Sequence, residues 1–152
     1  MYFWNIENLK KDISEDRLSE KDRFIYVLIP LLLLALTIET TRHTMGENIN
    51  HWDIIDSTFN VLIILIGAIF SFKANGGSNG SDFLGKYFSI SFVMSIRFIV
   101  YAIPLFIMLY AYYFMFSAEN HSTTNAIDVI PFLLWCAALY WRIYFHIKQL
   151  NL

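Results

Sequence analysis

FIVYAIPLFIMLYAYYFMF, residues 98–116, is the stretch that decides the fold, because it runs for 19 residues without a charged side chain. An α-helix rises about 1.5 Å per residue, so a run of this length spans roughly 28 Å, close to the ~30 Å hydrocarbon core of a bilayer. An apolar helix of that length is typical of a membrane span. We therefore expect residues 97–116 to cross a membrane.

Three further apolar runs flank this one and are separated from each other by polar stretches. The chain has 152 residues, of which 57% are hydrophobic, against about 45–50% in soluble domains. The excess is concentrated in these runs, which is the pattern of a multi-pass membrane protein. We expect an all-α protein with an amphipathic leader at 1–23 and a transmembrane domain at 24–152. Its four spans are expected at about 24–39, 54–72, 97–116 and 127–147.

The leader carries charges of both signs. Eleven charged residues occur between 7 and 23, whereas Tyr2, Ile6, Leu9 and Ile13 recur at helical spacing. This pattern predicts a short amphipathic helix. Two interpretations stay open: a solvated leader that orients the first span, or a helix that docks on a partner protein or the inner leaflet.

Helix-start signals precede the first two spans. The Ser19 hydroxyl is placed to accept a hydrogen bond from the Asp22 amide, which is the arrangement of a capping box. Asp53 and Asp56 are expected at the N-cap and N3 positions of the second span, where carboxylates are favoured by the helix dipole. These signals indicate helices that begin close to the apolar runs.

A polar stripe follows one face of the second span. Asp56, Asn60, Gly67 and Ser71 are spaced so that they share this face. Polar side chains in contact with lipid are costly, so we expect the stripe to face other helices.

The third apolar block, residues 83–116, is longer than one span needs. We expect 83–95 to be an interfacial helix along the inner leaflet, followed by a bend near Ser95–Arg97 and then the span. The alternative is one long helix that holds Arg97 inside the membrane.

Four polar residues are candidates for a role inside the membrane: Asp56, Asn60, Arg97 and Arg142. An arginine at the bilayer centre costs at least ~2.5 kcal/mol, so Arg97 either reaches the cytoplasmic headgroups or has a partner in the bundle. Asn60 and Asp56 are the candidate partners. Arg142 lies near the inner end of the fourth span, where a long side chain reaches the headgroups easily.

The distribution of lysine and arginine predicts the orientation. Four spans place the leader, the loop at 73–86 and the C-terminal tail on one side. These regions hold nine basic residues, whereas the opposite side holds only Arg42. The positive-inside rule assigns the first group to the cytoplasm. We expect a cell-membrane protein, in a bacterial inner membrane, with both termini cytoplasmic.

Three histidines and one glycine-rich stretch resemble metal sites in residue type only. His43, His51 and His121 all fall on the predicted outer side, but their spacing matches no zinc pattern. The glycine-rich stretch 75–82 has one acidic residue, whereas calcium takes six to eight oxygen ligands. We interpret the histidines as loop residues and 75–82 as a turn, and we expect neither a metal nor another cofactor.

The function is expected to be non-enzymatic. The sequence contains no nucleophile elbow, phosphate-binding loop, dinucleotide fingerprint or metalloprotease helix, and a net charge of −2 gives no reason to expect nucleic-acid binding. An anchor, sensor or regulatory component fits best, acting as a homo-oligomer or through a protein partner of the leader. A bacterial defence or immunity-type system matches this description. The alternative is an oligomeric channel or transporter subunit, because four helices of this size do not enclose an aqueous path alone.

Overall fold

The computed structural model describes residues 1–42, 50–116 and 126–150, and every regular element in these ranges is helical. The all-α prediction is therefore confirmed. The elements are α1 (Ile6–Ser14), α2 (Glu20–Arg42), α3 (His51–Ala74), the one-turn 3-10 helix η1 (Gly77–Asn79), α4 (Phe83–Phe116) and α5 (Ala126–Gln149).

Three helices in the described ranges, α3, α4 and α5, are long and apolar enough to cross a membrane. Large apolar side chains are exposed on their outer faces, which fits a lipid environment. α2 corresponds to the predicted first span and is not one of these three, although residues 24–38 contain no charged side chain.

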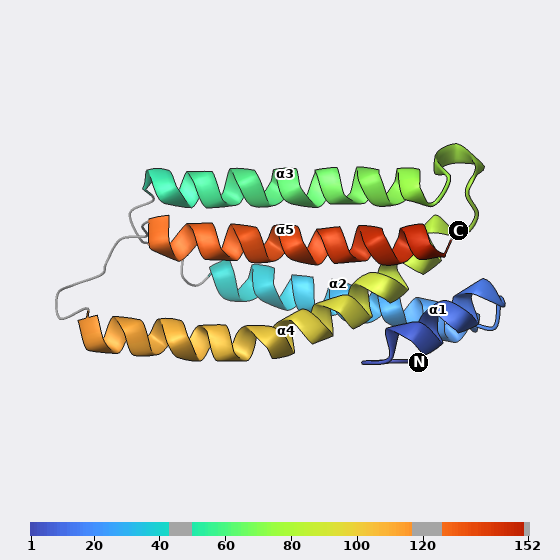
Figure 1. The fold of residues 1–152 in the computed structure, drawn as a ribbon, viewed down its shortest axis with the longest axis horizontal. Coiled ribbons are helices and arrows are strands. Elements are labelled where there is room, and N and C mark those ends of the chain that lie inside the picture. The colour runs from blue at the N-terminus through green and yellow to red at the C-terminus, as the bar shows by residue number, and fades with distance from the viewer. Residues whose placement is uncertain (43–49, 117–125, 151–152) are drawn as a thin grey trace.

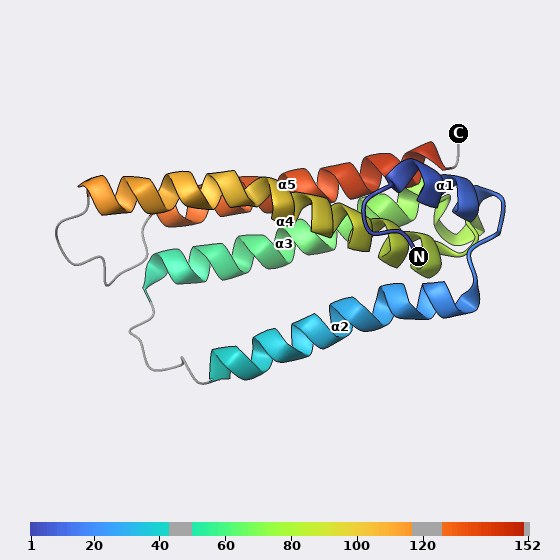
Figure 2. The ribbon, with the colours of Figure 1, turned by 90° about the horizontal axis from the view of Figure 1, so that it is seen from below.

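The four long helices lie roughly side by side (Figure 1). α2 packs against α4, α4 against α5, and α5 against α3. α3 and α5 run in the same direction, and α2 and α4 run in the opposite one. Figures 1 and 2 place the N-terminus, α1, the turn after α3 and the end of α5 at one end of the bundle. The leader, the 73–86 loop and the tail therefore lie together, as the sequence predicts.

Close packing between α3 and α5 depends on a glycine. A Cβ at Gly67 would lie 2.6–2.9 Å from side-chain atoms of Tyr140, so a larger residue would push the helices apart. Ser71, one turn further on, is buried. For these two residues the expectation that the polar stripe faces other helices is confirmed.

The helix starts agree with the sequence in one case and differ in the other. The Asp22 amide donates to the Ser19 hydroxyl at 3.1 Å, as predicted. α3 begins earlier than predicted, with Asn50 at the N-cap and Asp53 at N3 in a capping box. The prediction of Asp53 and Asp56 at these positions is wrong, because the Asn50 side chain is also an effective cap and precedes them.

α4 is one continuous helix of 34 residues. The prediction that 83–95 forms a helix of its own is therefore wrong, whereas its position at a membrane surface stays a prediction. Part of this segment packs against protein, with Ile90, Val93 and Met94 buried. Figure 1 shows a gentle change of direction near the middle of α4. Pro104 lies within the helix and lacks an amide hydrogen for the backbone ladder.

The glycine-rich stretch between α3 and α4 forms a tight turn. The Asn75 side-chain amide donates to the Ser81 carbonyl at 3.2 Å, and its oxygen accepts from Lys86 at 3.2 Å. A Cβ at Gly80 would lie only 1.9 Å from the Asn75 carbonyl oxygen, so glycine is required there. Gly76 has a φ of 94°, which favours glycine too.

Candidate functional site

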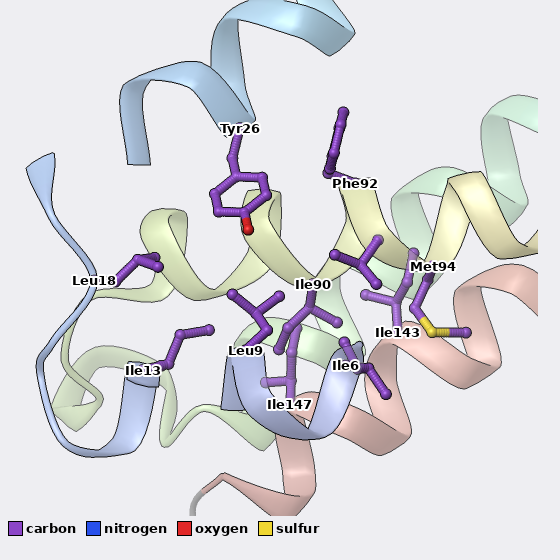
Figure 3. Packing of buried hydrophobic residues seen from close by; sticks show 11 residues of the cluster. Ile6, Leu9, Ile13, Leu18, Tyr26, Ile90, Phe92, Met94, Ile143 and Ile147 are labelled. Atoms are coloured by element: carbon purple, nitrogen blue, oxygen red, sulfur yellow. The ribbon is translucent and has the colours of Figure 1, made fainter. Parts of the chain in front are cut away.

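The leader packs against the end of the bundle through the apolar face of α1. Leu9 is fully buried, and Ile6, Ile13 and Leu18 are almost so. Figure 3 shows these side chains meeting residues of α2, α4 and α5. The facing residues in the same cluster are Tyr26, Ile90, Phe92, Val93, Met94, Ile143 and Ile147. The predicted amphipathic helix is thus present, and its apolar face is bound by the chain's own bundle.

The residues before α1 extend the contact to α2 and α4. The Tyr26 hydroxyl donates to the Tyr2 carbonyl at 3.1 Å and accepts from the Tyr2 amide. The Phe3 ring packs on Phe92 with centroids 5.8 Å apart. Because Tyr26 is fully buried, its hydroxyl needs such partners, and the leader backbone supplies them.

Arg97 binds the leader. Its Nε donates to the Trp4 carbonyl oxygen at 2.8 Å, and Nη2 donates to the same oxygen. Its guanidinium carbon lies 5.5 Å from the centroid of the Trp4 ring, which adds a cation–π contact. Among the residues that the structure places, neither Asn60 nor Asp56 bonds to Arg97, so those candidate partners are wrong. The observed partner is a backbone carbonyl.

Charged residues hold the rim of the same contact. Arg23, at the start of α2, pairs with Asp16 and with Asp82, each at 2.7 Å. It therefore joins the end of the leader to the turn before α4. Lys10 on α1 donates to the Gln149 side chain at the end of α5, at 2.8 Å. Exposed ion pairs of this kind contribute about 0–1 kcal/mol each, so they mainly set position.

Two leader residues have shifted acidities. The hydrogen bond from Lys10 lowers the pKa of Glu7 below its ordinary value, and the two groups lie 2.9 Å apart. The Tyr2 hydroxyl donates to the Asp12 carboxylate at 2.6 Å, and this bond raises the pKa of Tyr2. Both contacts lie within the leader, so they favour its ordered form near neutral pH.

Asp56 and Asn60 form a second polar feature, far along the bundle from the leader. The Asn60 amide donates to the Asp56 carboxylate at 2.9 Å and to the Asp56 carbonyl at 3.1 Å. Both residues line a cavity of about 600 Å³ among α3, α4 and α5. Its other lining residues are Ser95, Phe98, Ile99, Ala102, Leu105, Phe106, Phe132, Trp135, Cys136 and Leu139.

Arg142 belongs to neither feature. Its side chain is exposed on α5, and its guanidinium carbon lies 6.0 Å from the Phe145 ring centroid. The four candidate residues thus occupy three separate places: Asp56 and Asn60 at the cavity, Arg97 at the leader, and Arg142 on the surface.

The structure describes one of the three outer-side histidines, His51. His51 is exposed at the start of α3, whereas His43 and His121 lie outside the described residues. Within residues 1–42, 50–116 and 126–150, no three histidine, cysteine, aspartate or glutamate side chains are grouped to hold a metal ion.

Sequence reasoning did not identify Trp4 and Tyr26 as parts of the site. Trp4 accepts both hydrogen bonds from Arg97 through its carbonyl oxygen, which every residue has, and its ring adds the cation–π contact. The Tyr26 side chain carries a polar hydroxyl group within an apolar run of sequence. This hydroxyl group was the one signal that Tyr26 needs a hydrogen-bond partner.

No protein-family model matches the chain, and no curated protein or solved structure matches it either. The geometry of the leader and the cavity is therefore the basis for the function.

Proposed function

We propose that this chain is a four-span integral membrane protein that works by binding other molecules, as an anchor, sensor or regulatory component, and not by catalysis. α2 packs against α4, which is itself apolar enough to span, and this contact supports a shared membrane environment for the two helices. If α2 stayed outside the bilayer, the leader and the 75–82 turn would lie on opposite sides of the membrane. Their position at the same end supports a crossing α2 (Figure 2).

The basic residues support a cytoplasmic position for the leader end. Nine lysines and arginines flank the spans on this side, and one flanks them on the other. The positive-inside rule supports cytoplasmic termini, and we propose a bacterial inner membrane as the location.

The docked leader carries the proposal. α1 binds the bundle with one face and presents Glu7, Lys11 and Ser14, all exposed, on the other. A polar helix face held rigidly at the membrane surface is suited to contact a soluble partner or a second copy of the chain. A role in a bacterial defence or immunity-type system is compatible with this arrangement.

A photo-crosslinking amino acid at Lys11 tests this function in cells. We expect a discrete protein adduct from Lys11, and none from the same probe at Ile69 on the exposed apolar face of α3. Leu9→Asp should abolish the Lys11 adduct, because a buried carboxylate releases the leader. Failure of Lys11 to give any protein adduct, with the leader still docked, would contradict the proposal.

A channel or transporter subunit is the second candidate. It is favoured by the Asp56–Asn60 pair, which lines a cavity inside the predicted membrane region. Potassium flux into vesicles containing the purified protein tests it, with native mass spectrometry to count the copies. Flux that is lost in Asp56→Asn would establish this candidate over the first. The first proposal expects no flux from either protein.

A further inference from the structure

The cavity among α3, α4 and α5 has the size and composition of a small-molecule site. Its volume of about 600 Å³ lies within the ~300–1,000 Å³ range of ligand pockets, which are mostly apolar with a few polar groups. Here the polar groups gather at Asp56 and Asn60, and most of the remaining lining is apolar or aromatic.

The structure places no positively charged side chain of the described residues on the Asp56 carboxylate. Within the described residues, Asn60 is its only hydrogen-bond partner, and it forms no ion pair. No lysine or arginine occurs at 43–72 or at 98–141, the segments that supply most of the cavity wall. A carboxylate beside apolar surface is costly unless a positive charge completes it.

The charged group lies at one end of the cavity, and the apolar wall extends from it toward the middle of the bundle. Asp56 is in the second turn of α3, near the end of the predicted span, and Leu139 and Ser95 line the cavity deeper along α5 and α4. Trp135 lines it too, with its ring fixed against Phe98 at 5.1 Å between centroids. A charged head at Asp56 with an apolar body reaching inward would match this order, and aromatic faces attract cations.

We propose that this cavity binds an amphipathic organic cation, with its positive head at Asp56 and its apolar body along α4 and α5. This inference goes beyond the proposed function and does not depend on the leader having a partner. Among the residues that the structure describes, no lysine or arginine pairs with Asp56, and this supports a cation supplied by a separate molecule.

Cys136 lines the cavity and is the only cysteine in the chain, so it reports occupancy without any added label site. The rate at which N-ethylmaleimide alkylates Cys136 is measured on the full chain in a neutral detergent. Tetraphenylphosphonium and tetraphenylborate serve as probes, because they have the same shape and opposite charges. We expect the cation to slow alkylation at saturation and the anion to leave it unchanged.

Asp56→Asn should weaken protection by tetraphenylphosphonium about thirtyfold, which corresponds to the loss of one desolvated charge contact. Asp128→Asn is the matched control, since Asp128 starts α5 near the same end and does not line the cavity. Thermal melting of both variants checks that they fold. Protection by both ions alike, or protection by the cation that is unchanged in Asp56→Asn or equally lost in Asp128→Asn, would overturn the proposal.

Discussion

Leu9→Ala should release the leader from the bundle. Leu9 has no exposed surface, and truncating a buried leucine costs about 2–5 kcal/mol. We expect the lower part of that range, because α1 is a short helix at the edge of the cluster and can shift to fill the space. A loss of 2 kcal/mol raises the equilibrium constant for opening about thirtyfold.

The loss should be local to the leader. α2 packs on α4, and α3 packs on α5, through contacts that do not involve Leu9. Hydrogen exchange of the α1 amides, measured in detergent, reads the opening equilibrium directly. We expect α1 to lose about thirtyfold in protection, whereas the middle of α5 keeps its own.

Asn8→Ala is the control, since Asn8 is next to Leu9 on the exposed side of the same helix. A surface change of this kind shifts stability by about ±0.5 kcal/mol. Equal exchange in Leu9→Ala and Asn8→Ala would refute the assignment of Leu9 to the core. Loss of protection throughout α2–α5 would show instead that the leader and the bundle unfold together.

Three further predictions concern Arg97, Gly67 and Glu7. Arg97→Gln removes the charge-assisted bonds and the cation–π contact to the leader, so α1 should open more easily by about 1.5–3 kcal/mol, checked by the same exchange measurement. Gly67→Ala places a Cβ against Tyr140 and should destabilise the α3–α5 pair by about 1–3 kcal/mol. The melting temperature should fall in Gly67→Ala and be partly restored in the double variant Gly67→Ala/Tyr140→Ala. The Glu7–Lys10 stabilisation is present above the ordinary Glu pKa of 4.5 and is lost as the pH falls through the lowered value. Because Glu7 is exposed, Glu7→Gln should remove less than about 0.5 kcal/mol at pH 7 and progressively less as the pH falls through the lowered pKa, measured by leader exchange across that pH range.

The helices could be located from sequence because apolar runs and caps are local signals. The second span, expected at 54–72, is the core of α3 at His51–Ala74, and the fourth, expected at 127–147, is α5 at Ala126–Gln149. The spacing of Ile6, Leu9 and Ile13 identified the buried face of α1. The spacing of apolar residues identifies such a face but does not indicate which surface packs against it. The docking of α1 on its own bundle was therefore not predicted.

The errors at residues 83–97 share this cause. The length of the apolar block 83–116 was compared only with the thickness of a bilayer. Because the block is longer than one span, residues 83–95 were assigned to the membrane interface. In the structure the leader and α5 cover part of them, and α4 continues through them as one helix. The partner of Arg97 could not be predicted from side-chain types, because Trp4 binds it through the backbone.

Single-cysteine labelling tests the four-span account most directly, in a Cys136→Ser background with Ser14→Cys, His51→Cys or Asn79→Cys. Four spans with cytoplasmic termini predict that a membrane-impermeant maleimide labels only His51→Cys on intact cells, and labels Ser14→Cys and Asn79→Cys after lysis. Labelling of only one of Ser14→Cys and Asn79→Cys from outside would show that α2 does not cross. Labelling of both from outside, without labelling of His51→Cys, would reverse the orientation. Either result would contradict the account.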